Sequence, residues 1–324
     1  MPDTRRMILD QLADGRIHSG TALAQQLNIT RAAVWKHIHA LKSDGVIIES
    51  DAGTGYRIPG GICLFDKDVI RSLLCDTGKQ ADIFLHDKTG STNDWLMQRL
   101  ASGISSGTVC LAEQQTAGRG TRGRQWLSPY GKNLYISLYW HFQNSPLELG
   151  GLSLAVAAVI AGALADAGAE DIRIKWPNDL YTLGRKLGGI LIDMSAEVNG
   201  PSHVVIGIGL NIDMPQEHHQ SIDQDVADLR DAGLPLSFDR NQIAAMIIDA
   251  LYSCCHDFSS RGFCAFREAW HKLDMVTDRE VRLISGDRVV TGKARGVNDM
   301  GALELETDTG LQSFASGDVT LRLS

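Results

Sequence analysis

The sequence lacks any pair of cysteines with the C-x-x-C spacing; its cysteines are Cys63, Cys75, Cys110, Cys254, Cys255 and Cys264. This pattern disfavours a structural zinc site and a disulfide-rich secreted fold, so it indicates a reducing compartment. The charged residues 1–6 lack the apolar stretch of a signal peptide. The longest mostly apolar run, residues 149–165, is slightly short for a membrane span and favours a buried helix. We therefore expect a cytoplasmic protein without a membrane partner.

Excess positive charge is also missing, because 31 basic residues face 39 acidic ones and leave a net charge of −8. A general polyanion-binding protein is disfavoured, and any contact with nucleic acid must use a local basic surface. Walker A, H-E-x-x-H, G-x-S-x-G and protein-kinase motifs are absent, so the sequence offers no catalytic triad. What is present is length and apolar content: 324 residues, 44% of them hydrophobic, predict two or three packed domains.

Residues 1–60 have the element order of a winged helix-turn-helix domain. A short helix ends near Gly15, a second begins at Ser19, and Thr30 is placed to cap a third over residues 31–43. Two strands, residues 46–50 and 55–58, follow around a glycine-rich turn, and residues 53–57 form the predicted wing.

The third helix has the polarity of a recognition helix. An i, i+4, i+7 apolar stripe (Val34, Ile38 and Leu41) holds one side to the core and leaves Arg31, Trp35 and Lys36 to point outward. We expect these outward side chains to enter a DNA major groove. The alternative is a small helical accessory domain with a solvated basic face.

Beyond a linker at residues 59–61, the chain mixes strands and helices without strict alternation. The expected strands are 83–86, 108–112, 134–138, 172–174, 190–193 and 204–208, and the expected helices are 93–101, 149–167 and 242–258. This order predicts an α+β domain over residues 66–270 rather than a doubly wound one. Short alternating strands over residues 280–323 predict a small, SH3-like β-barrel as a third domain, residues 273–324.

The most informative segment is residues 118–126, Gly-Arg-Gly-Thr-Arg-Gly-Arg-Gln-Trp. Glycine allows a backbone to approach a ligand closely, and arginine offers a fork of donors for phosphate or carboxylate. The segment predicts a loop that orders over an anionic small molecule, with Trp126 as its lid. It also satisfies G-x-G-x-x-G, but residues 125–129 do not begin a helix, which disfavours a dinucleotide fold. The alternative is a solvated basic surface loop.

Four further sites have the composition of ligand contacts. Residues 91–94, Ser-Thr-Asn-Asp, open a helix and form either a capping box or a ligand site at its N-terminus. Residues 175–179 place polar groups at a turn. Lys186 precedes two glycines on an apolar strand, so it is either a phosphate-binding lysine or a surface lysine of an ordinary hairpin. Residues 207–211 offer a glycine-flanked strand for a flat ligand. Positive charge and glycine around an anion suit adenylyl transfer by positioning and electrostatics.

Residues 118–124, 175–179, 185–190 and 207–211, in this order, resemble the biotin protein ligases. With the N-terminal segment 19–41 and the β-rich tail, the whole chain resembles the bacterial bifunctional biotin ligases that also repress the biotin operon. The resemblance implies that biotin and ATP, with Mg²⁺, give biotinyl-AMP and pyrophosphate. The biotin acyl group then passes to a lysine of the biotin carboxyl carrier protein of acetyl-CoA carboxylase.

The resemblance also implies roles for particular residues. The biotin contacts are Ser91, Thr92, Asn93, Gln115, Arg119, Gly120, Thr121, Lys186, Gly189, Gly207 and Gly209. The ATP and adenylate contacts are Arg119, Arg122, Arg124, Trp126, Asn178, Lys186 and Asn211. Lys186 bridges the carboxylate and the α-phosphate, Arg119 borders the same anions, and Asp179 accepts the proton of the acceptor lysine or orients magnesium. The DNA contacts are Thr30, Arg31, Trp35, Lys36, His39 and Tyr56.

One position departs from the family pattern, since repressor-type members usually carry arginine where this chain has Thr121. Losing that cation puts the retention of the adenylate in doubt, although Arg122 is a neighbouring substitute. Three functions remain open at this point. They are a ligase that represses biotin synthesis as an adenylate-bound dimer on operator DNA, a ligase with a non-regulating winged helix, and a ligand-sensing transcription factor without catalysis.

Overall fold

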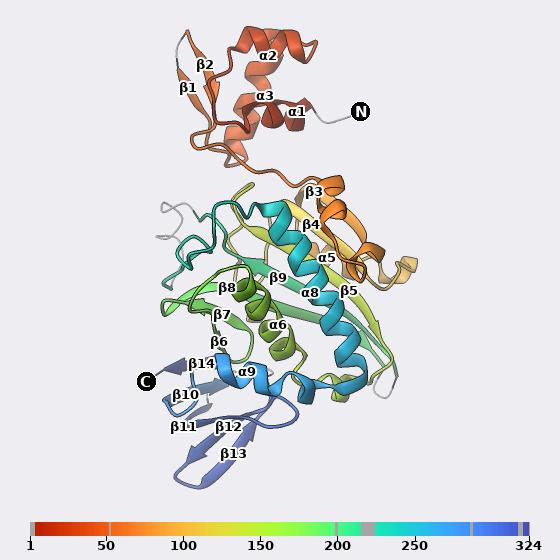
Figure 1. Ribbon diagram of the computed structural model, residues 1–324, viewed down its shortest axis with the longest axis vertical. Coiled ribbons are helices and arrows are strands. Elements are labelled where there is room, and N and C mark those ends of the chain that lie inside the picture. The colour runs from red at the N-terminus through yellow and green to blue at the C-terminus, as the bar shows by residue number, and fades with distance from the viewer. Residues whose placement is uncertain are drawn as a thin grey trace.

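The computed structural model describes residues 4–51, 53–197, 200–214, 224–285, 288–316 and 320–323. It arranges them as three units in chain order along the long axis (Figure 1). The N-terminal helices lie at one end, a large sheet with its covering helices lies in the middle, and the C-terminal strands lie at the other end.

The N-terminal unit is the predicted winged helix. Its elements are α1 (Thr4–Leu12), α2 (Gly20–Gln26), α3 (Arg31–Ser43), β1 (Glu49–Asp51) and β2 (Gly55–Arg57). Ser19 and Thr30 cap α2 and α3 through their side-chain oxygens, as their residue type predicts. The strand predicted over residues 46–50 is wrong in its first half. Gly45, at φ +89°, follows the end of α3, and the N–H of Val46 donates back to the carbonyl of Leu41, so residues 46–48 leave the helix without pairing as a strand.

The central unit is built on a seven-stranded sheet with the order β3-β4-β5-β9-β8-β7-β6. Its strands are β3 (Asp82–Thr89), β4 (Thr108–Gln115), β5 (Leu134–Phe142), β6 (Arg173–Lys175), β7 (Asp179–Thr182), β8 (Arg185–Ala196) and β9 (Ser202–Leu210). Only the β3–β4 pair is parallel among these described strands. The predicted α+β architecture is therefore confirmed, and every predicted strand is present, several of them longer than expected.

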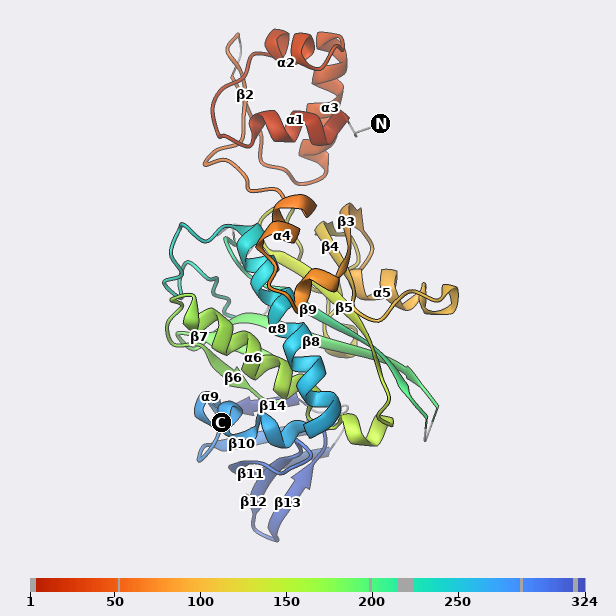
Figure 2. The same cartoon turned by 45° about the vertical axis from the view of Figure 1, so that its right-hand side comes forward.

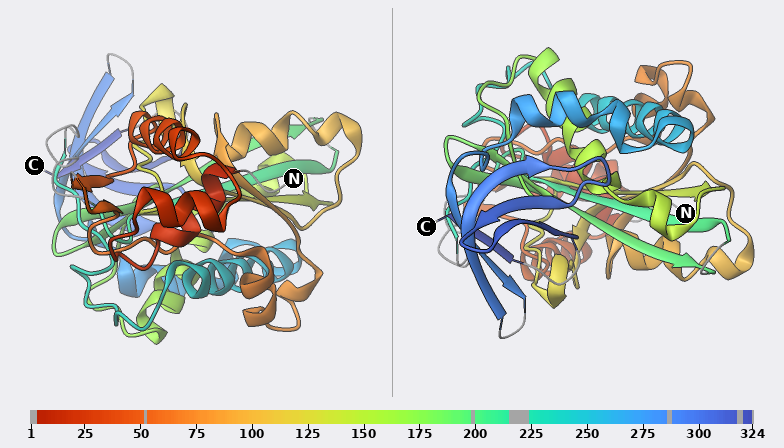
Figure 3. Two further views of the ribbon diagram at one scale, coloured as in Figure 1. Left: turned by 90° about the horizontal axis from the view of Figure 1, so that it is seen from above. Right: turned by 90° about the horizontal axis from the view of Figure 1, so that it is seen from below.

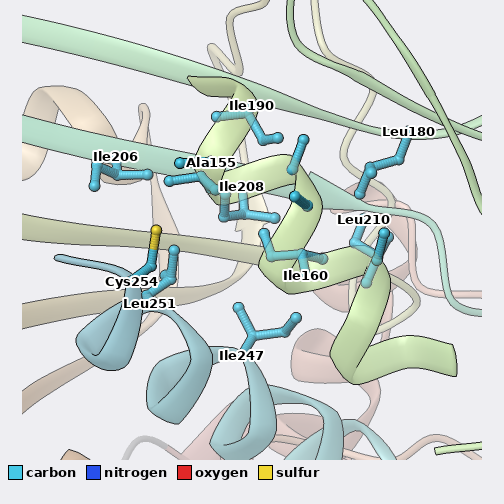
Figure 4. Close-up of a cluster of buried hydrophobic side chains, with 14 of the residues drawn as sticks. Ala155, Ile160, Leu180, Ile190, Ile206, Ile208, Leu210, Ile247, Leu251 and Cys254 are labelled. Atoms are coloured by element: carbon cyan, nitrogen blue, oxygen red, sulfur yellow. The ribbon is translucent and has the colours of Figure 1, made fainter. Parts of the chain in front are cut away.

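Helices cover the two faces of this sheet unequally. The helices are α4 (Lys67–Leu73), α5 (Thr92–Met97), α6 (Leu152–Asp166), α8 (Arg240–Arg261) and α9 (Arg267–Leu273). α6 and α8 lie side by side over one face, where Ile160 and Ile247 meet Ile206 and Ile208 of β9 (Figures 2 and 4). α5 packs on the opposite face. There Leu96 contacts strand residues whose side chains point away from α6 and α8.

Two of the predicted helices are shorter than the sequence suggested. α5 ends at Met97 rather than at residue 101, and a separate 3₁₀ turn covers Leu100–Ser102. α6 begins at Leu152 because the 3₁₀ turn Pro146–Leu149 precedes it. Residues 146–166 are the one stretch of the described chain that is long and apolar enough to cross a membrane. Since α6 supplies core residues against the sheet, its apolarity is explained by burial inside the molecule.

The C-terminal unit is an antiparallel sheet with the order β13-β12-β11-β10-β14. Its strands are β10 (Glu280–Ser285), β11 (Arg288–Val297), β12 (Leu303–Thr307), β13 (Gly310–Phe314) and β14 (Thr320–Leu323). The indole of Trp176 donates to the carbonyl of Gly301 at 3.1 Å and ties this unit to the central one. Figure 3 shows the winged helix and this sheet from the two ends of the molecule. The β-rich tail predicted from the sequence is confirmed.

Candidate active site

A cleft of about 760 Å³ opens on the sheet face that carries α5. This volume lies within the range of small-molecule sites. The structure brings into this one cleft all the ligase residues named from the sequence: Ser91, Thr92, Asn93, Gln115, Arg119, Gly120, Thr121, Arg122, Arg124, Trp126, Asn178, Asp179, Lys186, Gly189, Gly207, Gly209 and Asn211. They come from loops and strands that are more than a hundred residues apart in the sequence.

One end of the cleft is a buried polar network at the start of α5. Gln115 accepts hydrogen bonds from the backbone N–H and the hydroxyl of Thr92, at 2.9 and 3.1 Å. Ser137 of β5 donates toward the oxygens of Thr92 and Asn93, at 2.7 and 2.6 Å. The amide of Asn93 donates to Asp193 at 2.9 Å. These groups present fixed donors and acceptors in an otherwise apolar wall, as recognition of a neutral polar ring requires.

Glycines on the central strands make room for this network. A Cβ at Gly207 would collide with the side-chain amide of Asn93, and one at Gly209 would lie 2.5 Å from the Trp126 ring. Gly189 of the neighbouring strand lies under the same ring, 3.6 Å from it by the same measure. The side chains of Asn93 and Trp126 thus lie directly on this glycine floor, and glycine is required at residues 207 and 209 because any larger residue would displace them.

The arginine loop closes over the cleft as a compact turn. The N–H of Trp126 donates to the carbonyl of Gly118 at 2.8 Å, and that of Gly120 donates to Arg124 at 2.7 Å. The guanidinium of Arg119 pairs with Asp94 and with Asp193, the latter at 3.1 Å. Hydrogen bonding to Asp94 above all raises the pKa of Arg119.

The capping box expected at residues 91–94 is only half formed. Ser91 does accept the N–H of Asp94, at 3.3 Å, but the Asp94 carboxylate pairs with Arg119. An ion pair to a guanidinium is stronger than a reciprocal cap, which explains the difference.

Lys186 is the buried cation of the cleft, 9% exposed, so its reading as a surface lysine is wrong. Its ammonium lies 2.7 Å from Asp179 and 5.7 Å from the ring centroid of Trp126. Backbone hydrogen bonds from residues 225–227 hold the strand at this point, since Lys186 N–H donates to Asp225 and the N–H of Ala227 donates to Lys186. A fixed lysine beside a glycine floor is poised to meet a developing negative charge.

The sequence reasoning missed several groups that line or support the cleft. Ser137 and Asp193 hold Asn93, and the alternation of β5 and β8 could have placed both on the same face as the glycines. Lys175 and Arg322 add two more cations to the lining. Burial, together with the nearby charges of Lys186, Arg322 and Arg124, lowers the pKa of Lys175, against the opposing effect of Asp179. No local signal could have revealed Arg322, because it comes from the C-terminal unit.

Within the described chain, no group of three His, Cys, Asp or Glu side chains converges as a metal centre. All six cysteines are free thiols. Asp179 is the carboxylate that lines the cleft. A single carboxylate fits a Mg²⁺ ion that takes its other ligands from substrate phosphates and water, and it does not fit an all-protein metal site.

The second candidate surface is the exposed side of α3. Arg31, Trp35, Lys36 and His39 are all exposed, Trp35 by 59%, and the rings of Trp35 and His39 meet edge-on with their centroids 5.1 Å apart. Val34, Ile38 and Leu41 are buried in the core of the winged helix, as predicted. The other two residues predicted to contact DNA have structural roles. Thr30 caps α3, and Tyr56 exchanges two backbone hydrogen bonds with His18. The surface therefore has the shape and charge of a recognition helix beside a wing.

Family models match three consecutive segments of this chain. An HTH domain matches residues 4–57, the biotin/lipoate A/B protein ligase family matches residues 57–211, and the biotin protein ligase C terminal domain matches residues 277–322. The first and third matches fall on the winged helix and the C-terminal sheet, and the second covers the central sheet but ends before α8 and α9. Fold and cleft thus define a protein ligase of the biotin/lipoate class joined to a winged helix.

The bifunctional ligase/repressor BirA of Salmonella typhimurium is 41% identical over 315 residues, which cover 97% of this chain and 96% of the relative. BirA of Escherichia coli is 40% identical over 311 residues, with coverages of 96% and 95%. The biotin protein ligase from Aquifex aeolicus, solved in complex with biotin and ATP, has a TM-score of 0.63 and 27% identity, covering 75% of this chain and 99% of its own. The chain belongs to the family of bifunctional biotin ligase/repressors.

Proposed function

We propose that this protein is an ATP-dependent biotin ligase that also represses biotin synthesis, and that it works in the cytoplasm. One observation carries the proposal: a single cleft joins a fixed polar network, a glycine floor and a group of cations that includes Lys186. A winged helix with an exposed basic helix is attached to the same chain.

In the proposed complex, biotin lies in the cleft over β8 and β9, between the Trp126 ring and Asn93, with its ureido ring at the polar end. Thr92, Asn93 and Gln115 supply the ring's hydrogen bonds, with Ser91 beside them at the helix start. The carboxylate of biotin reaches toward Lys186 and the backbone of Gly120 and Thr121. Trp126 and Asn211 flank the adenine of ATP. Arg119, Arg122, Arg124 and Asn178 border the phosphates, and the half-buried Lys175 and the exposed Arg322 extend the same positive wall.

The first reaction joins biotin to AMP. A carboxylate oxygen of biotin attacks the α-phosphorus, a new oxygen–phosphorus bond forms, and the bond to pyrophosphate breaks. Lys186 neutralises charge that grows on the phosphoryl oxygens, which lowers the barrier without covalent catalysis. Mg²⁺ would neutralise the departing phosphates, and Asp179 is the residue that would hold it, together with phosphate oxygens.

The second reaction transfers biotin to a lysine of the biotin carboxyl carrier protein. The lysine amine attacks the acyl carbon, an amide bond forms, AMP departs, and Asp179 accepts the proton of the amine. The test incubates the full chain with biotin, ATP and the carrier domain, and follows the carrier by intact mass. One biotinyl group on the acceptor lysine is expected. No mass increase in the presence of both substrates would contradict the ligase assignment.

Thr121→Arg should slow the release of biotinyl-AMP. The hydroxyl of Thr121 accepts a hydrogen bond from Arg124 at 3.1 Å. Because Thr121 lines the cleft, a guanidinium at position 121 would reach the adenylate. One charge-assisted contact corresponds to a release about tenfold slower. The release of labelled adenylate would be timed for the wild type and for Thr121→Arg, with Thr309→Arg in the distant β12–β13 turn as the control. Equal rates would show that another group, such as Arg122, already supplies this contact.

Operator binding should require the adenylate and should weaken steeply with salt. We propose that biotinyl-AMP orders residues 118–126 and favours a dimer, which presents two copies of α3 to paired half-sites. The ligand can act in this way only if it binds the dimer-competent state more tightly. Arg31 and Lys36 release counterions from DNA phosphates, which explains the salt dependence.

An anisotropy titration on DNA upstream of this organism's biotin synthesis genes, with and without biotin and ATP, tests this prediction. Tight binding only with both substrates is expected, and Lys36→Ala should weaken it. Equal and weak binding in both conditions would leave a ligase with a non-regulating winged helix.

A further inference from the structure

Glu113, near the end of β4, is a carboxylate with no exposed surface that lies between two arginines from different units. Arg6 of α1 donates to one of its oxygens at 3.1 Å, and Arg240, at the first turn of α8, donates to the other at 2.7 Å. The backbone N–H of Phe65 donates to it as well, at 2.6 Å. The winged helix therefore supplies one of the two cations that balance a carboxylate inside the ligase unit.

The same cluster continues toward the nucleotide end of the cleft. The guanidinium of Arg240, only 4% exposed, donates twice to the carbonyl of Asn133, at 3.2 and 2.8 Å. The side chain of Asn133 is fully buried, donates to Asn211 at 3.4 Å, and accepts the N–H of Ile212 at 3.0 Å. Asn211 lines the cleft. A continuous series of hydrogen bonds thus runs from Arg6 to the cleft wall.

Because its charges are buried, this series of hydrogen bonds responds to a change at either of its ends. Removing one partner of a buried ion pair leaves the other charge uncompensated, and nearby groups shift to accommodate it. Arg240 is held by Glu113 and by two carbonyls, those of Asn133 and Cys63, so it cannot turn to solvent without breaking these hydrogen bonds. A disturbance of Glu113 is therefore passed to Asn133, and from there to the side chain of Asn211, which lines the cleft and donates in turn to the carbonyl of Ala227 at 3.0 Å.

We propose that Glu113 is a positioning residue for the nucleotide end of the site, and that Arg6 of the winged helix acts on that site through it. The inference rests on the proposed function, because it takes Asn211 as a contact of ATP. It assigns the DNA-binding unit a direct part in nucleotide affinity. Biotin recognition is separate, since Thr92, Asn93 and Gln115 form their own hydrogen-bond network.

The test measures KM for ATP and KM for biotin separately, in the full chain. Arg6→Met should raise KM for ATP by about three- to tenfold and leave KM for biotin and kcat nearly unchanged. Glu113→Gln should raise KM for ATP by a larger factor. The double variant with Arg6→Met should have nearly the same KM for ATP as Glu113→Gln alone. Arg6→Lys keeps the charge near Glu113 and should restore most of the ATP affinity.

Arg5→Met is the matched control, because Arg5 lies on the same helix and pairs with Asp44 inside the winged helix. Thermal unfolding of each variant shows whether it folds, and if Arg6→Met does not, Glu113→Gln carries the same test: an unchanged KM for ATP in that variant would overturn the inference. An unchanged KM for ATP in Arg6→Met, or an equal rise in KM for biotin or in the Arg5→Met control, would overturn the inference alone. A wild-type chain without activity on biotin and ATP would overturn the proposed function and this inference with it.

Discussion

Lys186→Ala is expected to lower the rate of biotin- and ATP-dependent pyrophosphate release by about a hundredfold or more. Lys186 is nearly buried, pairs with Asp179 at 2.7 Å, and lies beneath Trp126 in the cleft. Losing one fixed charge that faces a developing oxyanion costs about 2–4 kcal/mol of transition-state stabilisation. The fold should survive, because the ammonium faces a ligand cleft.

The matched control is Lys272→Ala, since Lys272 is a highly exposed lysine on α9 that pairs with Glu268. Initial rates with coupled pyrophosphate detection and a thermal unfolding curve would be recorded for both variants. Near-normal release from a folded Lys186→Ala protein would remove this residue from its proposed role.

Gly207→Ala should weaken biotin binding by about ten- to a hundredfold, since overpacking of this kind costs about 1–3 kcal/mol. The added methyl group would collide with the side chain of Asn93. Asn93 must then give up its hydrogen bonds with Ser137 and Asp193, which fix it at the polar end of the cleft. Titration calorimetry with biotin alone would measure the change.

Gly162→Ala provides the control, because a Cβ there meets no atom within 4 Å. Its biotin affinity should equal that of the wild type. If Gly207→Ala also binds biotin normally, the close approach of Asn93 to β9 has no part in recognition, and the proposed biotin position is wrong.

Much of the fold could be predicted because its signals are local. The stripe of Val34, Ile38 and Leu41 and the cap at Thr30 defined α3 to the residue, since both depend on neighbours within a turn or two. The strands of the central sheet were recognisable by their apolar runs. The boundary errors, at residues 46–48 and at the end of α5, lie where backbone closure rather than side-chain pattern decides the conformation.

The candidate site was predictable in its motifs and not in its contacts. The glycines and arginines of residues 118–126 indicated an anion-binding loop because both residue types have specific chemistry. The pairing of Arg119 with Asp94 and Asp193 could not be inferred, because it joins three segments that only the folded sheet brings together. The same holds for Arg322, which enters the cleft from the last strand of the chain.

The most direct measurement of the central claim is pyrophosphate release by the purified full chain with biotin and ATP, together and singly. The account predicts release only when both are present, with one equivalent of biotinyl-AMP bound to the protein in the absence of carrier. Release with ATP alone, or no release with both substrates at any magnesium concentration, would contradict the assignment of the cleft as a biotin-activating site.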